Sequence, residues 1–340
     1  MLGEDDVHCC NARALPIPLA ERFRERLPLT KTTPIVSLGE GSTPLLAAPR
    51  LSERLGCELW LKWEGANPTG SFKDRGMTIA VSKALEEGVE ALVCASTGNT
   101  AASAAAYAAR AGLRCLILQP AGAVALGKLA QARASGARVL EVRGSFDEIL
   151  AAARELAGRG THTLVNSLNP YRIEGQKTAA FEIVEELGTP PDVLALPYGG
   201  GGNARAYFKG FDELSLGIPR ILAAESAVRA ETFASAIRIV DPVHADEVAK
   251  ALEASRGAVC SLSENAILDA WRSLAQEEGV FCEPASAAAL AAVAGGEVSS
   301  GARVVCVITG HGLKDPESVT QLTAAPLVVD ADADEIAAAA

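Results

Sequence analysis

Short apolar runs alternate with longer segments of helical periodicity along most of the chain. The apolar runs predict strands at residues 59–63, 91–96, 113–119, 138–142, 192–197, 220–224 and 303–309. The periodic segments predict helices at residues 73–87, 100–110, 146–156, 174–187, 203–213, 264–278 and 286–293. Such alternation is typical of parallel sheets whose two faces are both covered by helices.

The series of strand–helix units predicts an α/β protein with two doubly wound, mostly parallel sheets and a ligand site in the crevice between them. A chain of 340 residues also exceeds one ordinary domain. We expect an N-terminal segment at residues 1–40, a larger domain made of residues 41–80 and 166–323, a smaller nested α/β domain at residues 81–165, and a C-terminal tail at residues 324–340. The tail is rich in alanine and aspartate and is expected to be peripheral.

The composition narrows the class of protein. A formal net charge of −11 argues against a nucleic acid or an anionic membrane as partner. The chain starts with the acidic sequence Met1-Leu2-Gly3-Glu4-Asp5-Asp6 and has no long apolar run, so we expect neither a signal peptide nor a membrane span. The cysteines form no CxxC pair, and His8-Cys9-Cys10 lacks a second ligand pair that would complete a metal site. We therefore expect a reduced, cytoplasmic protein that binds no metal.

One lysine stands where a helix is predicted to begin. The sequence Asn67-Pro68-Thr69-Gly70-Ser71-Phe72-Lys73 leads from a strand into this helix, and Ser71 is expected to cap the helix by accepting a backbone N–H. Unpaired amides and the helix dipole would disfavour a charged ammonium at Lys73. A neutral amine is what a carbonyl cofactor needs to form an imine. The alternative is an ordinary surface lysine on the first turn of a helix.

A glycine-rich loop follows the predicted strand at residues 192–197. Its residues are Gly199, Gly200, Gly201, Gly202 and Asn203. Successive glycines allow backbone amides to approach an anion closely and the helix start adds its dipole, so the loop suits a single phosphate group. The pattern Gly199-x-Gly201-x-x-Ala204 also fits a dinucleotide fingerprint, with Glu225 as the acid that would bind a ribose. A flexible turn without a ligand is the third interpretation.

A second loop, after the predicted strand at residues 91–96, is rich in polar groups. Ser96, Thr97, Asn99 and Thr100 offer hydroxyls, an amide side chain and free N–H groups. These groups suit a carboxylate or a phenolate-like oxygen. Ordinary capping of the following helix would use the same residue types.

Two other predicted strands also end in polar residues. After the last one, Thr309 could present a neutral hydroxyl to a ring nitrogen, and His311 between two glycines has either a catalytic or a backbone role. Asn166, Ser167 and Arg172 follow an apolar run near residue 165. Arg172 could donate paired hydrogen bonds to a phosphate or a carboxylate. It could equally be a solvated cation at a helix start, where the dipole disfavours it.

Together these motifs resemble the threonine synthases, which are fold-type II (tryptophan-synthase β-like) enzymes that depend on pyridoxal 5'-phosphate. The matching segments keep the family's order and are residues 67–77, 96–100, 166–176, 199–203, 283–286 and 309–316. The resemblance implies a lyase that converts O-phospho-L-homoserine and water to L-threonine and phosphate by γ-elimination and β-addition. It also implies a homodimer, a phosphorylated amino acid as the small-molecule partner, and cofactor binding by the larger domain.

The resemblance also implies a role for each candidate residue. Lys73 would form the Schiff base and move protons, and Asn99 would bond the ring oxygen of the cofactor. The loop from Gly199 to Asn203 would hold the cofactor's phosphate, and Thr309 would face its pyridine nitrogen and leave it unprotonated. The residues implied for the substrate are Ser96 and Thr97 for its carboxylate, and Thr100, Asn166, Ser167 and Arg172 for its phosphate.

Two positions depart from the family's pattern. The family usually has Gly-Asn-Ala-Gly-Asn in the phosphate loop, and Gly200 replaces the first Asn, which in the family reaches toward the substrate's phosphate. After residues 221–224 the chain continues with Glu225-Ser226-Ala227-Val228-Arg229, where the family tends to have Gly-Ala-Ala-Pro and a longer segment. A carboxylate and an arginine near the pocket would change which substrate is accepted.

These departures keep open a paralogue that catalyses β-replacement, or elimination and deamination, on serine, O-phosphoserine or a related amino acid. A nicotinamide-dependent Rossmann enzyme is a second alternative, based on the glycine fingerprint. A non-catalytic relative that serves as a binding partner is a third.

Overall fold

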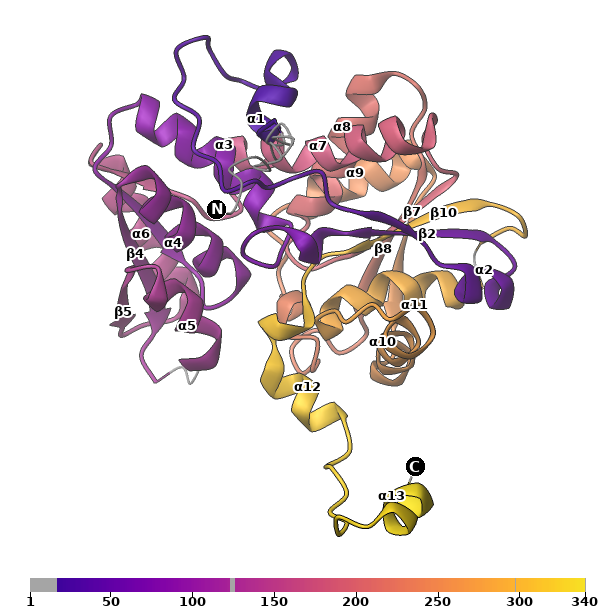
Figure 1. Ribbon diagram of the computed structural model, residues 1–340. Helices are drawn as coiled ribbons and strands as arrows, with labels where there is room; N and C mark the ends of the chain where they lie inside the picture. Colours follow the sequence, from indigo (N-terminus) through magenta and orange to yellow (C-terminus); the bar gives the residue numbers. More distant parts are fainter. Residues whose placement is uncertain (1–16, 123–125, 297, 340) are drawn as a thin grey trace, which may run out of the picture.

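The structure, a computed structural model, describes residues 17–122, 126–296 and 298–339 and contains two β-sheets (Figure 1). The larger sheet has six strands in the order β1-β2-β10-β7-β8-β9, and only the β1–β2 pair is antiparallel. Its strands are β1 (Leu45–Ala47), β2 (Glu58–Trp63), β7 (Val193–Pro197), β8 (Arg220–Ser226), β9 (Ala258–Leu262) and β10 (Arg303–Ile308).

The smaller sheet has four parallel strands in the order β5-β4-β3-β6. Its strands are β3 (Ala91–Ala95), β4 (Arg114–Pro120), β5 (Arg138–Val142) and β6 (His162–Leu164). These strands are consecutive in the sequence, whereas the larger sheet takes strands from before and after them. The fold class is thus the predicted one, while the limits of the domains stay a prediction.

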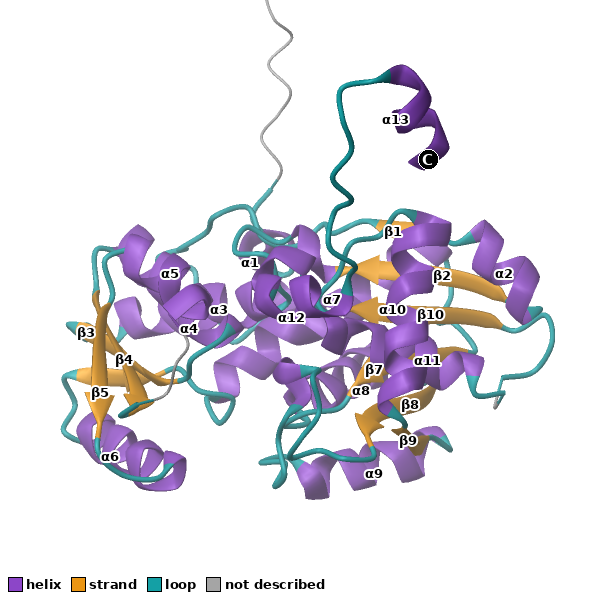
Figure 2. Ribbon diagram, turned by 90° about the horizontal axis from the view of Figure 1, so that it is seen from below, coloured by secondary structure: helices purple, strands orange, loops and turns teal. Residues whose placement is uncertain are grey.

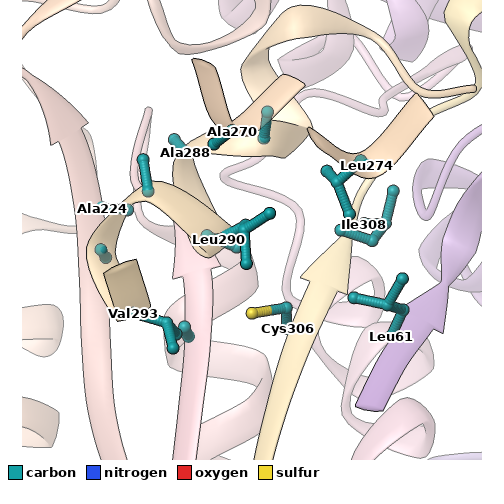
Figure 3. Packing of buried hydrophobic residues seen from close by; sticks show 14 of the residues in the cluster. Leu61, Ala224, Ala270, Leu274, Ala288, Leu290, Val293, Cys306 and Ile308 are labelled. Carbon is teal, nitrogen blue, oxygen red and sulfur yellow. The ribbon is translucent and has the colours of Figure 1, made fainter. Parts of the chain in front are cut away.

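Helices cover both faces of the larger sheet, as the side-chain alternation along β7 illustrates. Val193 and Ala195 pack with α2 (Pro49–Leu55), α10 (Glu264–Glu278) and α11 (Ala288–Ala294) in the core cluster of Figure 3. Leu194 and Leu196 point to the other face, against α7 (Pro170–Leu187), α8 (Gly202–Leu214) and α9 (Ala245–Ser255). A strand that is apolar at every position therefore requires a helical layer on each side.

The remaining helices cover the smaller sheet and the periphery (Figure 2). They are α1 (Leu19–Arg22), α3 (Lys73–Glu86), α4 (Asn99–Ala111), α5 (Leu126–Ala134), α6 (Phe146–Gly158), α12 (Pro316–Leu322) and α13 (Ala333–Ala339). The C-terminal residues leave the body of the molecule and end in the exposed helix α13, as expected for a peripheral tail (Figure 1). None of the helices in the described parts of the chain is long and apolar enough to cross a bilayer.

Every strand and helix predicted above is present, with shifted ends, but several elements were missed. Strand β9 was missed because it lies at the sheet edge, where Val259 and Cys260 are not buried and the apolar run is interrupted. Helix α7 begins at Pro170, four residues before the predicted start, because Asn169 caps it by accepting from Tyr171 N. An Asn-Pro pair at a helix start is a recognisable signal.

Helices α3 and α7 touch through their backbones. A Cβ atom on Gly175 would lie 1.9 Å from the carbonyl oxygen of Arg75, and a Cβ on Gly76 would lie 2.7 Å from that of Arg172. Only glycine fits at both positions, since real Cβ atoms do not approach backbone oxygens so closely. This crossing places the first turn of α3, which begins with Lys73, against the first turns of α7.

Buried charged side chains connect the crossing of α3 and α7 to the larger sheet. The Arg75 guanidinium donates to Glu64 Oε2 at 2.7 Å and to Glu182 Oε2 at 2.6 Å. Lys62 on β2 donates to the same Glu182 oxygen at 2.9 Å. Although burial alone would raise the pKa of Glu182, Arg75 and Lys62 lower it to about 2. Two cations and two carboxylates therefore compensate each other in a site closed to water.

Replacing Gly175 by alanine should destabilise the protein, because the added Cβ cannot be accommodated without separating α3 from α7. We expect a loss of at least about 3 kcal/mol in the free energy of unfolding, measured by denaturant titration. Gly158→Ala is the matched control, since Gly158 lies in α6 and nothing stands within 4 Å of its added Cβ. Equal stability of the two variants would contradict the backbone contact.

Candidate active site

A cavity of about 620 Å³ lies where β3, β7 and β10 end, and residues that follow strands of both sheets line it. Open α/β sheets bind ligands at the carboxyl ends of their strands. The cavity brings together all residues predicted for the site: Lys73, Ser96, Thr97, Asn99, Thr100, Asn166, Ser167, Arg172, Gly199, Gly200, Gly201, Gly202, Asn203 and Thr309. Segments that are far apart in the sequence therefore meet in one place.

Lys73 is the first residue of α3, and the pKa of its amine is lowered to about 7. Burial is the largest cause, the positive charge of Arg172 adds to it, and the carboxylate of Glu283 acts in the opposite direction. The direction agrees with the sequence-based expectation, but the main causes are tertiary rather than the helix dipole. A substantial fraction of the amine is therefore neutral near pH 7.

The predicted cap of α3 by Ser71 is wrong. The N-cap residue is Phe72, no side chain caps the helix, and Asp74 N donates to the backbone oxygen of Ser71. Asp74 holds the turn instead, accepting from Thr69 N at 2.7 Å and from Thr69 Oγ1 at 2.6 Å. Ser71 pairs as an isolated β-bridge with Gly310, which draws it away from the helix end.

The loop Gly199–Asn203 connects β7 to α8 and is shaped by its glycines. Gly201 has a φ of 85°, and a Cβ there would lie 2.8 Å from Val248 Cγ2. Asn203 is 8% exposed, and its Nδ2 has no hydrogen-bond partner among the described residues. A helix N-terminus, tightly turned glycines and an unused donor fit a single phosphate group.

Glu225 does not support the dinucleotide alternative. Its carboxylate is bound by the Arg229 guanidinium, and neither residue is among the described residues that line the cavity. Arg229 also donates to Ile239 O at 2.9 Å and lies over the Tyr198 ring at 4.8 Å. The pair thus lies near the pocket, as expected, but Glu225 and Arg229 bind each other instead of lining the cavity, and Arg229 holds the backbone oxygen of the wall residue Ile239.

The side chains of the loop at residues 96–100 do not cap α4. The N-cap residue of α4 is Gly98, and no side-chain oxygen accepts from the first helical amides. Ser96 Oγ accepts from Gly98 N at 3.3 Å. Asn99 Nδ2 donates to both carboxylate oxygens of Glu283, at 2.9 and 3.2 Å. The hydroxyls of Ser96, Thr97 and Thr100 all lie at the cavity, which favours the ligand interpretation over capping.

Thr309 directly follows strand β10 and lines the cavity. Its Oγ1 pairs with Ser286 Oγ at 2.8 Å, and Gly310 N donates to the same Ser286 oxygen at 2.9 Å. Both groups are neutral hydroxyls. His311 packs between Trp63 and Phe281, its Nδ1 accepts from Leu313 N at 3.2 Å, and it is not among the described lining residues. The geometry favours a structural role for His311.

Arg172 is a buried cation that forms no ion pair with any of the residues that the structure describes. It is 1% exposed, Nη1 donates to Val165 O at 3.2 Å, and Nε has no partner among the described residues. Burial lowers the pKa of its guanidinium to about 10. The alternative of a solvated cation is wrong, and an unpaired buried guanidinium is favourable only if a ligand supplies the negative charge.

Asn166 has a different role from Arg172. Its Oδ1 accepts from Ala95 N at 2.9 Å, and its Nδ2 donates to Ala95 O at 2.8 Å. Both ends of the amide are thus used to join the chain after β6 to the end of β3. Asn166 is therefore placed to position the loop that carries Ser167.

Two buried polar residues that line the cavity, Glu283 and Gln176, had been given no role from the sequence. Glu283 is 4% exposed and binds Asn99, and it belongs to the matching segment 283–286. Gln176 is 3% exposed, and its Oε1 has no partner among the described residues. Its spacing from Arg172, one helical turn further along α7, is the signal that could have identified it.

The chain is similar to known proteins over most of its length. Residues 36–310 match the family described as pyridoxal-phosphate dependent enzyme. A threonine synthase of Halalkalibacterium halodurans is 50% identical over 88% of this chain and 90% of its own, and one of Mycobacterium tuberculosis is 50% identical over 93% of each chain. The crystal structure of the T.th. threonine deaminase aligns with a TM-score of 0.67 at 28% identity, covering 79% of this chain and 92% of that one.

The lowered pKa of Lys73 can be measured in the cofactor-free chain. The neutral amine reacts with acylating reagents, so labelling of Lys73 should pass through half of its maximum near pH 7. Arg172→Gln should move this midpoint to higher pH, because the charge of Arg172 is one cause of the lowering. Peptide mass spectrometry measures the labelling, with the exposed Lys250 followed in the same digest. A midpoint near 10.5 in the unchanged protein would contradict the burial of the amine.

Proposed function

The chain belongs to the family of pyridoxal-phosphate-dependent enzymes, and we propose that it acts as a threonine synthase. In this reaction O-phospho-L-homoserine and water give L-threonine and phosphate, so the protein is a lyase that eliminates phosphate. The observation that carries the proposal is the buried guanidinium of Arg172, which lines the same cavity as Lys73, has no carboxylate partner among the described residues and keeps Nε without a hydrogen bond. Such a group suits a substrate that brings its own phosphate.

Pyridoxal 5'-phosphate is the cofactor, and the residues of the cavity fit it. The Gly199–Asn203 loop has the free amides and the unused Asn203 donor that a phosphate group requires. We propose that this loop holds the cofactor's phosphate, Asn99 its ring oxygen and Thr309 its ring nitrogen, with Lys73 as the covalent anchor. When bound, the cofactor withdraws electrons from the α-carbon of the substrate and makes its protons removable.

Lys73 is proposed to carry the protons of the reaction. With a pKa of about 7 its amine can exchange one proton at a time: it can accept the proton from Cα, must release it before it accepts one from Cβ, and can return a proton to the product. Its position at the start of α3 lets the flexible side chain reach more than one carbon. Arg172 raises the fraction of neutral amine without contacting the reacting carbons, because its charge disfavours the ammonium.

The substrate is proposed to be held at both of its charged groups, the carboxylate and the phosphate. Ser96 and Thr97 would receive its carboxylate, since their hydroxyls are not used to cap α4. Thr100, Ser167 and Arg172 would receive its phosphate, and Asn166 would position the loop that carries Ser167 through its hydrogen bonds to Ala95. Phosphate leaves from Cγ as a dianion, and the guanidinium of Arg172 would stabilise that charge.

The alternative paralogue is less favoured, because Glu225 and Arg229 pair with each other and neither is among the described residues that line the cavity. Gly200 is the remaining departure: a Cβ there would be 3.6 Å from Ile239 Cδ1, so a Cβ atom fits at this position without a clash. The homodimer and the cytoplasmic location expected from the sequence remain proposals as well.

Purified protein incubated with O-phospho-L-homoserine should release threonine and phosphate in equal amounts. Chromatographic amino-acid analysis and a colorimetric phosphate assay measure the two products. Lys73→Ala should abolish both, because no other group is proposed to carry the protons. Phosphate without threonine, or turnover of O-phosphoserine in place of O-phosphohomoserine, would replace this function by the paralogue alternative.

Replacing Arg172 by glutamine should weaken the binding of phosphorylated substrate while the cofactor stays bound. The loss of charge-assisted hydrogen bonds predicts an increase in KM of about tenfold to a hundredfold. The yellow colour of the cofactor should remain, because Arg172 is proposed to hold the substrate's phosphate only. An unchanged KM for O-phosphohomoserine would remove Arg172 from the substrate site.

A further inference from the structure

Glu283 is a carboxylate at a buried position, where an ionised carboxylate is energetically unfavourable. It lies between Cys282 and the short 3₁₀ helix Pro284–Ala287, lines the cavity, and is only 4% exposed. Burial raises the pKa of its carboxyl, although the Asn99 hydrogen bond and the charges of Lys314 and Lys73 act against this rise. Asp315 is the other charged group that faces it. A buried acid is retained only where specific partners hold it.

The backbone around Glu283 is built to hold the carboxylate in one place. Its backbone N donates to Gly310 O at 3.0 Å, which ties it to the residue after Thr309. A Cβ on Gly310 would lie 2.5 Å from Glu283 Oε1, so only glycine leaves room for the carboxylate at this point. The position of both oxygens is thus set by the chain on one side and by Asn99 on the other.

The carboxylate determines which way the Asn99 amide faces. Asn99 Nδ2 donates to Oε2 at 2.9 Å and to Oε1 at 3.2 Å. An ionised carboxylate can only accept hydrogen bonds, whereas an asparagine amide has one accepting and one donating end. The amide nitrogen of Asn99 must therefore face Glu283. If the amide were reversed, its oxygen would lie against the two carboxylate oxygens of Glu283, which would be repulsive. The two oxygens of one carboxylate lie on the same side of Nδ2 and share one of its hydrogens, so the second hydrogen is available to an oxygen in the cavity.

We propose that Glu283 is a positioning residue, which acts on the cofactor through Asn99 by turning the amide nitrogen toward the cofactor's ring oxygen. The inference rests on the cofactor role proposed for Asn99, and it does not depend on which amino acid is the substrate. Glu283 itself needs no contact with the substrate. Its effect should appear in cofactor binding and vanish when Asn99 is removed.

A double-mutant cycle on cofactor affinity tests the proposal. The full-length chain is freed of cofactor and titrated with pyridoxal 5'-phosphate, and the dissociation constant is read from the absorbance of the bound form. Glu283→Ala and Asn99→Ala should each weaken binding by about tenfold, and the double variant should be no weaker than Asn99→Ala alone. Glu283→Gln should recover most of the affinity, because its amide oxygen can still accept from Asn99 Nδ2.

The matched control is Glu90→Ala, which removes an exposed carboxylate paired with Arg114 at 2.6 Å. It should leave the dissociation constant unchanged. Additive effects of Glu283→Ala and Asn99→Ala, or full affinity of Glu283→Ala, would overturn the proposal. If circular dichroism shows that Glu283→Ala does not fold, the cycle is run with Glu283→Leu. If neither variant folds, Glu283→Gln decides: a folded Glu283→Gln that binds the cofactor no better than Asn99→Ala also overturns the proposal.

This titration is independent of the threonine reaction. A wild-type protein that binds the cofactor but does not convert O-phosphohomoserine would refute the proposed function alone. The cycle would still report whether Glu283 and Asn99 act as a unit.

Discussion

The contact between the backbones of α3 and α7 at Gly76 and Gly175 is the constraint on which the site depends. It brings the first turn of one helix, with Lys73, against the first turns of the other, with Arg172. Side chains larger than hydrogen at either glycine would separate the two helices. A pair of glycines that looks dispensable in the sequence therefore sets the distance between the amine and the guanidinium.

The same crossing is stabilised and made reactive by two different arrangements of charge. Arg75, one residue before the contact, is fully compensated by Glu64 and Glu182. Arg172, on the cavity side, has no carboxylate among the described residues and lowers the pKa of Lys73. Arg75, whose charge is compensated, holds the helices together. Arg172, whose charge is not, leaves a positive charge for an anionic ligand. This local positive charge would offset the net charge of −11 for the phosphorylated substrate proposed above.

Sequence reasoning succeeded where one physical requirement dominates a segment. Strands such as β7 are buried on both faces, so their apolar runs were recognisable, and the glycine loop after β7 had to turn tightly into α8. It failed where a partner outside the motif decides the role of a residue. Ser71 was expected to cap α3 but pairs with Gly310, which is distant in the sequence. Glu225 was expected to influence the substrate from near the pocket, but it is bound by Arg229, four residues further along the chain, and does not line the cavity.

The sequence by itself determined the α/β class, the order of the strands and helices, and the residue types that gather at the strand ends, because burial and turn geometry act on short stretches of chain. The tertiary structure alone decided the state of those residues. Lys73 owes its lowered pKa to burial and to Arg172, and the Asn99 amide is turned by Glu283, which lies far away in the sequence. Burial, the nearest charge and the available hydrogen-bond partner depend on the packing of distant segments, so they could not be deduced from the residues around Lys73.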